Sequence, residues 1–167
     1  MRLFKHTEPE PDAGSTERRV DPSVLRDGML LAEWYILHRL DEELERSRRY
    51  DRPLSVIVVA PMLLPGERPT SLELEVAAAA ARAASRSSDL LGRLGRDSIL
   101  MIMPETSPEG ARVAAFRWRS DMWLRRGVGG HKWEAVIMEN LGDFETGEQL
   151  IRAATDRLSS KDPEDAA

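Results

Sequence analysis

The sequence predicts an α/β protein in which helices cover both faces of a mixed central β-sheet. Amphipathic segments and apolar, β-branched runs alternate in the order helix, strand, helix, hairpin, helix, strand, helix, the pattern of a layered α/β domain. The hairpin is the second observation, because the turn Gly95-Arg96-Asp97-Ser98 is followed directly by five large apolar residues, Ile99 to Met103. The length of 167 residues suits one domain with a sizeable core.

The composition narrows the classes of protein to which the chain can belong. A net charge of -5 argues against general nucleic-acid binding, and no apolar run approaches the length of a membrane span. The absence of cysteine excludes a disulfide framework, and the three histidines lack the spacing of metal ligands. The N-terminus lacks the pattern of an export signal, so we expect a cytoplasmic protein. From the charge, the lack of a long apolar run and the lack of metal-ligand spacing, we expect no nucleic-acid partner, no membrane partner and no cofactor.

Composition also divides the chain into three parts. Residues 1–20 are polar and charged and contain two prolines, so we expect a mobile N-terminal tail. The folded domain is expected over residues 21–160, and residues 161–167 form a second polar tail.

A long first helix is expected from Asp21-Pro22, where Asp caps the helix and Pro stands in its first turn, to about Tyr50. Apolar residues at spacings of three and four define its buried face: Leu30, Trp34, Leu37, Leu40 and Leu44. A basic cluster closes the helix: Arg46, Arg48, Arg49 and Arg52. This cluster either attracts an anion or is a solvated helix end, where positive charge also suits the helix dipole.

Local signals predict the other strands and helices. The run from Leu54 to Val59 is rich in β-branched residues and predicts a buried strand, and residues 133–138 predict the last strand. Further helices are expected to begin at Thr70 or Ser71, at Ser107 before a proline, and at Thr146.

The helix that follows Ser107 has more than one apolar side. Trp118 lies on the face that its alanines share, whereas Val113, Phe116 and Trp123 lie on others. We therefore expect this helix either to be buried on more than one side or to serve an interface.

The stretch from Arg86 to Pro104 resembles the signature hairpin of GGDEF domains, the diguanylate cyclase family. In that family an Arg-x-x-Asp pair is followed after five residues by Gly-Gly-Asp-Glu-Phe at the turn, and then by an apolar strand that ends in Pro-Glu-Thr. Here the pair is Arg86 and Asp89, and the turn is Gly95-Arg96-Asp97-Ser98-Ile99. The resemblance covers roughly residues 25 to 158 and implies the palm-like fold of nucleotide cyclases.

The resemblance also implies that the chemistry of the family is lost. Its two carboxylate ligands for magnesium correspond here to Ala60 and Ser98, neither of which offers a charged oxygen. Arg96 stands where the second glycine lets the backbone approach the nucleotide. Residues 61–69 form a shorter loop without the segments that hold the guanine base. These losses predict a chain that is not a diguanylate cyclase.

The Arg86-x-x-Asp89 pair is the strongest functional signal that remains. In the family this pair forms the inhibitory site, which binds the product, cyclic di-GMP. Arginine forks to a phosphate or to the Hoogsteen edge of guanine, and aspartate accepts from guanine N1 and N2 hydrogens. Arg82 and Arg93 are expected to add positive charge. The alternative is a surface ion pair that flanks a helix-to-strand turn.

Two residues of the turn keep alternative roles. Arg96 either holds an anionic ligand where the metals of the family would lie, or points to solvent or pairs with Asp97. Asp97 is retained from the signature, but aspartate in a turn is also expected for local hydrogen bonding alone.

Functions from different classes therefore stay open. The first is a GGDEF-like signalling domain without catalysis that binds cyclic di-GMP through Arg86 and Asp89. The second is a protein-interaction or dimerisation module, favoured by the tryptophan-rich helix over residues 107–124, that binds no nucleotide. Residual activity on another nucleotide is a third possibility, against which the lost metal ligands argue.

Overall fold

The computed structural model describes residues 30–125, 130–139 and 141–160. Along the chain these residues form α1 (Glu33–Tyr50), β1 (Leu54–Met62), α2 (Ser71–Ala84), β2 (Leu90–Leu94), β3 (Ser98–Pro104), α3 (Pro108–Leu124), β4 (Lys132–Met138), a short 3-10 helix (Leu141–Asp143) and α4 (Gly147–Ser159). Both predicted tails, and the predicted helix start at Asp21-Pro22, lie outside the described residues. None of the helices described combines the length and the apolar character that crossing a membrane requires.

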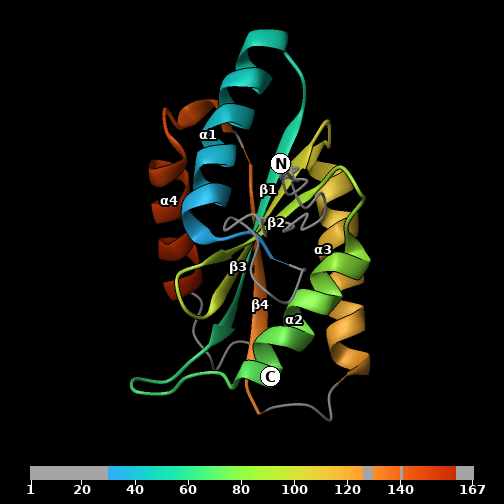
Figure 1. The fold of residues 1–167 in the computed structure, drawn as a ribbon, viewed down its shortest axis with the longest axis vertical. Helices are drawn as coiled ribbons and strands as arrows, with labels where there is room; N and C mark the ends of the chain where they lie inside the picture. The colour runs from blue at the N-terminus through green and yellow to red at the C-terminus, as the bar shows by residue number, and fades with distance from the viewer. Residues whose placement is uncertain (1–29, 126–129, 140, 161–167) are drawn as a thin grey trace, which may run out of the picture.

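The strands form one sheet in the order β2-β3-β1-β4, with helices on both of its faces. In Figure 1, α1 and α4 lie on one side of the sheet and α2 and α3 on the other, which confirms the predicted α/β architecture. All three strand pairs are antiparallel, whereas the sequence predicts a mixed sheet. Within the described residues, parallel pairing is confined to a single bridge between Leu31 and Gly92 at the outer edge of β2.

The central strand β1 is buried because each face of the sheet is covered. Ile57 and Val59 point toward α2 and α3, while Val56 and Val58 point toward α1 and α4. Successive side chains of a strand face opposite sides, so a strand covered on both sides is expected to read as a continuous apolar run. This explains why the sequence of β1 shows no alternation of polar and apolar residues.

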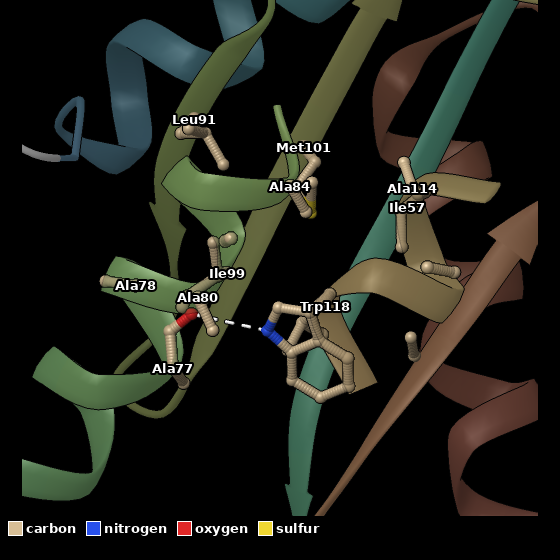
Figure 2. Packing of buried hydrophobic residues seen from close by; sticks show 14 of the residues in the cluster. Ile57, Ala77, Ala78, Ala80, Ala84, Leu91, Ile99, Met101, Ala114 and Trp118 are labelled. Carbon is tan, nitrogen blue, oxygen red and sulfur yellow. Dashed lines mark hydrogen bonds between the residues drawn. The ribbon is translucent and has the colours of Figure 1, made fainter. Parts of the chain in front are cut away.

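One face of the sheet is packed by a tryptophan against small residues. Trp118 of α3 is only 1% exposed, and it lies beside Ala77 and Ala80 of α2 and close to Ile99 of β3 (Figure 2). Its indole Nε1 donates a hydrogen bond to the Ala77 carbonyl oxygen, at 3.3 Å. The alanine run of α2 therefore makes room for one large side chain from the neighbouring helix.

The first helix begins later than the sequence predicts. The Leu31 N–H donates to the Leu91 oxygen and the Arg93 N–H donates to the Leu31 oxygen, at 2.8 and 2.9 Å, and Ala32 is the extended N-cap of α1. A helix cannot run through Leu31, because its backbone groups are used at the edge of β2. The prediction of one continuous helix through this residue is therefore wrong.

The buried face of α1 is also rotated from the predicted one. Ile36, Leu40 and Leu44 are fully buried, whereas Trp34 is 62% exposed. Gly92 explains the contact, because a Cβ at this position would lie 2.4 Å from Ile36 Cβ. The absence of a side chain at Gly92 thus lets α1 rest directly on β2.

The predicted caps of α2, α3 and α4 are confirmed. The side-chain oxygens of Thr70, Ser107 and Thr146 each accept from the backbone N–H three residues later, at the starts of α2, α3 and α4. Each of these hydrogen bonds satisfies a donor that the helix itself leaves unpaired. Because they depend only on neighbouring residues, they could be read from the sequence.

Candidate functional site

The two sites predicted from the sequence lie at opposite ends of the β2–β3 hairpin. Arg86 and Asp89 precede β2, and the turn Gly95-Arg96-Asp97 follows it. Since β2 has five residues, it separates the two sites by about 17 Å, at roughly 3.4 Å a residue. The two sites are therefore separate places on the molecule.

The turn site brings together the two positions that the resemblance equates with metal ligands. The ladder between β1 and β3 ends at the pair Val59 and Ile99, so Ala60 and Ser98 come next on neighbouring strands. Alanine has no ligand atom, and a serine hydroxyl is neutral, whereas Mg²⁺ prefers charged oxygens. Within the residues that the structure describes, no group of three or more Asp, Glu or His side chains is arranged to hold a metal.

The backbone of the turn is hydrogen-bonded to a carboxylate that the sequence did not reveal. The N–H of Gly95 donates to Oε1 of Glu33 at 2.8 Å, and the left-handed φ of 59° at this residue suits glycine. Glu33 stands in the first turn of α1, and the Leu31–Gly92 bridge and the packing of α1 on β2 bring it here. No local signal in the sequence marks a contact of this kind.

Arg93 and Arg96 lie together at the turn. Arg93 donates from Nη2 to the Arg96 carbonyl oxygen at 3.1 Å, so the structure places Arg93 with the turn and not with Arg86 and Asp89. Arg96 is exposed and makes no ion pair with Asp97, which agrees with the solvent-facing alternative for its side chain.

At the other end of β2, Asp89 closes the turn between α2 and β2 from inside. Its Oδ2 accepts from the backbone N–H of Arg86 at 2.7 Å, and the carboxylate is buried, with the residue 3% exposed. Its other oxygen, Oδ1, is buried without a hydrogen-bond partner among the described residues. Arg86 and Asp89 therefore do not form the surface ion pair that was the alternative. Asp89 accepts from the backbone of Arg86, and the Arg86 side chain is exposed.

The unpartnered oxygen of Asp89 is an unusual feature. Buried polar atoms are nearly always hydrogen-bonded, and one left unsatisfied costs about 1–3 kcal/mol. Arg82 lies exposed in the last turn of α2, and Arg86 lies exposed two residues after the helix ends.

The basic cluster at the end of α1 is engaged within the molecule. Arg46 pairs with Glu43, Arg49 with Glu45 and Arg52 with Glu105, while Arg48 donates to the carbonyl oxygens of Phe144 and Glu145. Beside Arg46 and Arg52 lies a small, partly open pocket of about 40 Å³, which Glu43 and Glu105 also line. The side chains of Arg46, Arg49 and Arg52 are also mostly exposed, which agrees with the alternative of a solvated helix end.

The most strongly held carboxylate is that of Glu73, at the start of α2. It is 2% exposed and accepts hydrogen bonds from Thr70 N and Oγ1 and from His131 N and Nδ1, at 2.7 to 3.0 Å. Burial acts to raise the pKa of this carboxyl, but the hydrogen bonds outweigh burial and lower the pKa to about 2. Glu73 thereby fastens the residue that leads into β4 to the first turn of α2.

Comparison with known proteins identifies the fold. No family model matches the chain, and no curated protein matches it. Solved structures do match: a DGC protein from Thermotoga maritima has 18% identity and a TM-score of 0.64, over 76% of this chain and 94% of that one. The GGDEF domain of DgcB from Caulobacter crescentus, in complex with c-di-GMP, has 12% identity and a TM-score of 0.65, over 89% and 92%.

A third structure, the GGDEF domain of FimX from Pseudomonas aeruginosa, has 13% identity and a TM-score of 0.63, over 83% of this chain and 95% of that one. At identities this low the likeness shows the fold, and function has to be argued from the site. The chain therefore has the fold of GGDEF domains, as its hairpin predicts.

Proposed function

We propose that this chain is a non-catalytic signalling domain with the GGDEF fold. One observation carries the proposal: Ala60 and Ser98 follow the last pair of the β1–β3 ladder on neighbouring strands, at the positions where the resemblance implies two carboxylates. Transfer of a nucleotidyl group needs metal ions to neutralise charge on the phosphates, and these side chains offer no charged ligand. The exposed Arg96 adds positive charge beside them but no metal ligand.

Incubation of the protein with GTP and Mg²⁺ should yield no cyclic di-GMP and no pyrophosphate above a blank without protein. Chromatography of the nucleotides measures the first product and a phosphate-release assay the second. The control is Asp97→Ala, which removes the retained aspartate of the turn and should behave like the wild type. Turnover that Asp97→Ala abolishes would contradict the proposal.

The ligand we propose for the domain is cyclic di-GMP, held at Arg86 and Asp89. Three observations support it: the kept spacing of the pair, the exposed Arg86 side chain and the unpartnered Oδ1 of Asp89. The similar DgcB domain was solved in complex with c-di-GMP. An arginine fork suits the phosphate or the Hoogsteen edge of guanine, and a carboxylate suits guanine N1 and N2 hydrogens. Arg82 adds charge for the phosphates.

Burial of Asp89 sets the cost of this binding. Because the carboxylate is buried, a guanine reaches its Oδ1 only if the turn opens, and an opening that breaks the bond from the N–H of Arg86 to Oδ2 costs about 1–3 kcal/mol. Binding is therefore weaker than at a pair that is already exposed, and its heat includes the opening of the turn.

Calorimetric titration of cyclic di-GMP should show binding in the wild type that Arg86→Ala weakens by about tenfold or more, the loss expected for a charged hydrogen bond. Arg157→Ala, an exposed arginine on α4 across the sheet, is the matched control and should leave the affinity unchanged. Binding kept in Arg86→Ala would move the site elsewhere, with Arg96 the next position to test. No binding in the wild type would contradict this part of the proposal.

A second function, binding to another protein, is favoured by the surface of α3. Phe116 and Leu124 are 71% and 74% exposed, and Val113 is 50% exposed, although all three are apolar. Trp118 of the same helix is buried and supports the fold instead.

A further inference from the structure

The Arg86–Asp89 corner, which consists of residues 86–89 between α2 and β2, presents hydrogen-bond donors to the solvent. Arg86, Ser87 and Ser88 are exposed, and Arg82 is exposed in the last turn of α2. Guanidinium and hydroxyl groups donate to phosphate oxygens, and an arginine fork does so through two parallel bonds. The phosphates are the same in every cyclic dinucleotide, so contacts of this kind do not depend on the base.

The acidic side chain of the corner faces inward. Asp89 is 3% exposed, and its Oδ2 accepts from the Arg86 N–H at 2.7 Å, while its Oδ1 is buried as well. A backbone hydrogen bond from the Asp89 N–H to the Arg86 carbonyl oxygen, at 3.2 Å, closes the same turn. Among the four residues of the corner, Asp89 has the one side chain that only accepts hydrogen bonds.

This enclosed carboxylate is the group that selects guanine when it reaches the base. Guanine presents N1 and N2 hydrogens on its Watson–Crick edge, whereas adenine presents N1 as an acceptor, which a carboxylate repels. Here the contact forms only if the turn opens and the bond from the Arg86 N–H to Oδ2 breaks. The loss of a hydrogen bond to a charged group is of the same size as the discrimination that a bidentate base contact provides. The loss therefore offsets the gain, and little preference for guanine is left.

Arg86 is the other residue of the corner whose side chain distinguishes bases. Its fork fits the two acceptors of the guanine Hoogsteen edge, and it fits a phosphate equally well. Hydrogen bonds between two ionised groups are stronger than bonds to a neutral base, and the exposed Arg86 reaches a phosphate without any opening of the turn. The phosphate is therefore the stronger partner for Arg86.

We propose that the Arg86–Asp89 corner recognises the phosphates of a cyclic dinucleotide and discriminates only weakly between its bases. Cyclic di-AMP, which has the same phosphates and sugars with adenine in place of guanine, should bind with an affinity within about tenfold of that of cyclic di-GMP. Asp89 is a positioning residue in this site, because it holds the backbone of Arg86. This inference rests on the proposed function, since it concerns the specificity of the same site.

Parallel calorimetric titrations of the full chain with cyclic di-GMP and with cyclic di-AMP test the specificity. The two dissociation constants should differ by less than about tenfold. A difference of about tenfold or more, in either direction, overturns this inference, and cyclic di-GMP binding with a strong preference for guanine leaves the proposed function in place. If cyclic di-GMP does not bind, the proposed function fails and this inference fails with it, so the two failures are distinguishable.

Two variants test the parts assigned to the arginine and the carboxylate. Arg86→Ala should weaken the binding of both ligands by the same factor, about tenfold or more, and Arg157→Ala should change neither affinity. Asp89→Asn keeps an oxygen that accepts from the Arg86 N–H but removes the charge, so it should leave the ratio of the two affinities unchanged. Thermal unfolding of both variants checks that the fold is kept. A loss confined to cyclic di-GMP, in either variant, overturns the inference, because that residue then reads guanine.

Discussion

Replacement of Trp118 by alanine should lower the free energy of unfolding by about 3–5 kcal/mol, the range for loss of a large aromatic residue from a core. The side chain is 1% exposed and fills the space between α2 and the sheet (Figure 2). Its neighbours on α2, Ala77 and Ala80, are too small to move into the cavity that the substitution leaves. The hydrogen bond from Nε1 to the Ala77 oxygen is lost as well. Urea denaturation followed by far-UV circular dichroism measures the change.

Trp123→Ala is the matched control for Trp118→Ala, since both tryptophans belong to α3. With 62% of its surface exposed, Trp123 should contribute no more than about 0.5 kcal/mol. Trp118→Phe should fall between the two, because it keeps most of the packing and loses the hydrogen bond. Equal losses for Trp118→Ala and Trp123→Ala would show that α3 does not pack as described.

Glu73→Gln should lower the free energy of unfolding at pH 7 by about 2–4 kcal/mol and should make stability less sensitive to acid, since hydrogen bonds to a charged group are worth about 1.5–3 kcal/mol. The Glu73 carboxylate accepts from four donors of Thr70 and His131. Glutamine keeps the shape but replaces one acceptor oxygen with a donor, which then faces other donors.

The sign of the pH dependence follows from the direction of the pKa shift. The pKa of Glu73 is about 2 in the folded chain and 4.5 in its ordinary state, so folding favours the ionised form. Its contribution is therefore complete above about pH 4.5 and is lost as the pH falls toward 2. Denaturation curves between pH 7 and pH 2.5 should show the gap between wild type and Glu73→Gln closing as the pH falls.

Glu75→Gln, on an exposed position of the same helix, serves as the control for Glu73→Gln. It should follow the pH dependence of the wild type throughout. A gap between wild type and Glu73→Gln that stays constant across the acid range would contradict the assignment of a strongly lowered pKa to Glu73.

The parts of the fold that the sequence predicts well depend on neighbouring residues. The apolar run of β1, the turn at Gly95 and the caps at Thr70, Ser107 and Thr146 each act within a few positions, and each appears where expected. The start of α1 was missed because it depends on a distant strand: Leu31 pairs with β2, which lies some sixty residues further along the chain.

The site shows the same division between near and distant contacts. The spacing of Arg86 and Asp89 is visible in the sequence, but the burial of Asp89 results from the way α2 and β2 pack. Glu33 meets Gly95 across a separation of 62 residues, and Glu73 meets His131 across 58. No local pattern in the sequence encodes contacts between residues so far apart, so neither contact could be predicted from it.

The segment that leads into α1 is hydrogen-bonded to the hairpin of β2 and β3. Leu31 is hydrogen-bonded to Leu91 and Arg93 on either side of Gly92, and Glu33 holds Gly95 at the turn. Leu30, directly before Leu31, is buried in the apolar core, so the segment is anchored to the core and to the hairpin together. The strand β2, which joins the turn to the Arg86–Asp89 corner, is thus fixed along its outer edge by backbone hydrogen bonds from outside the hairpin.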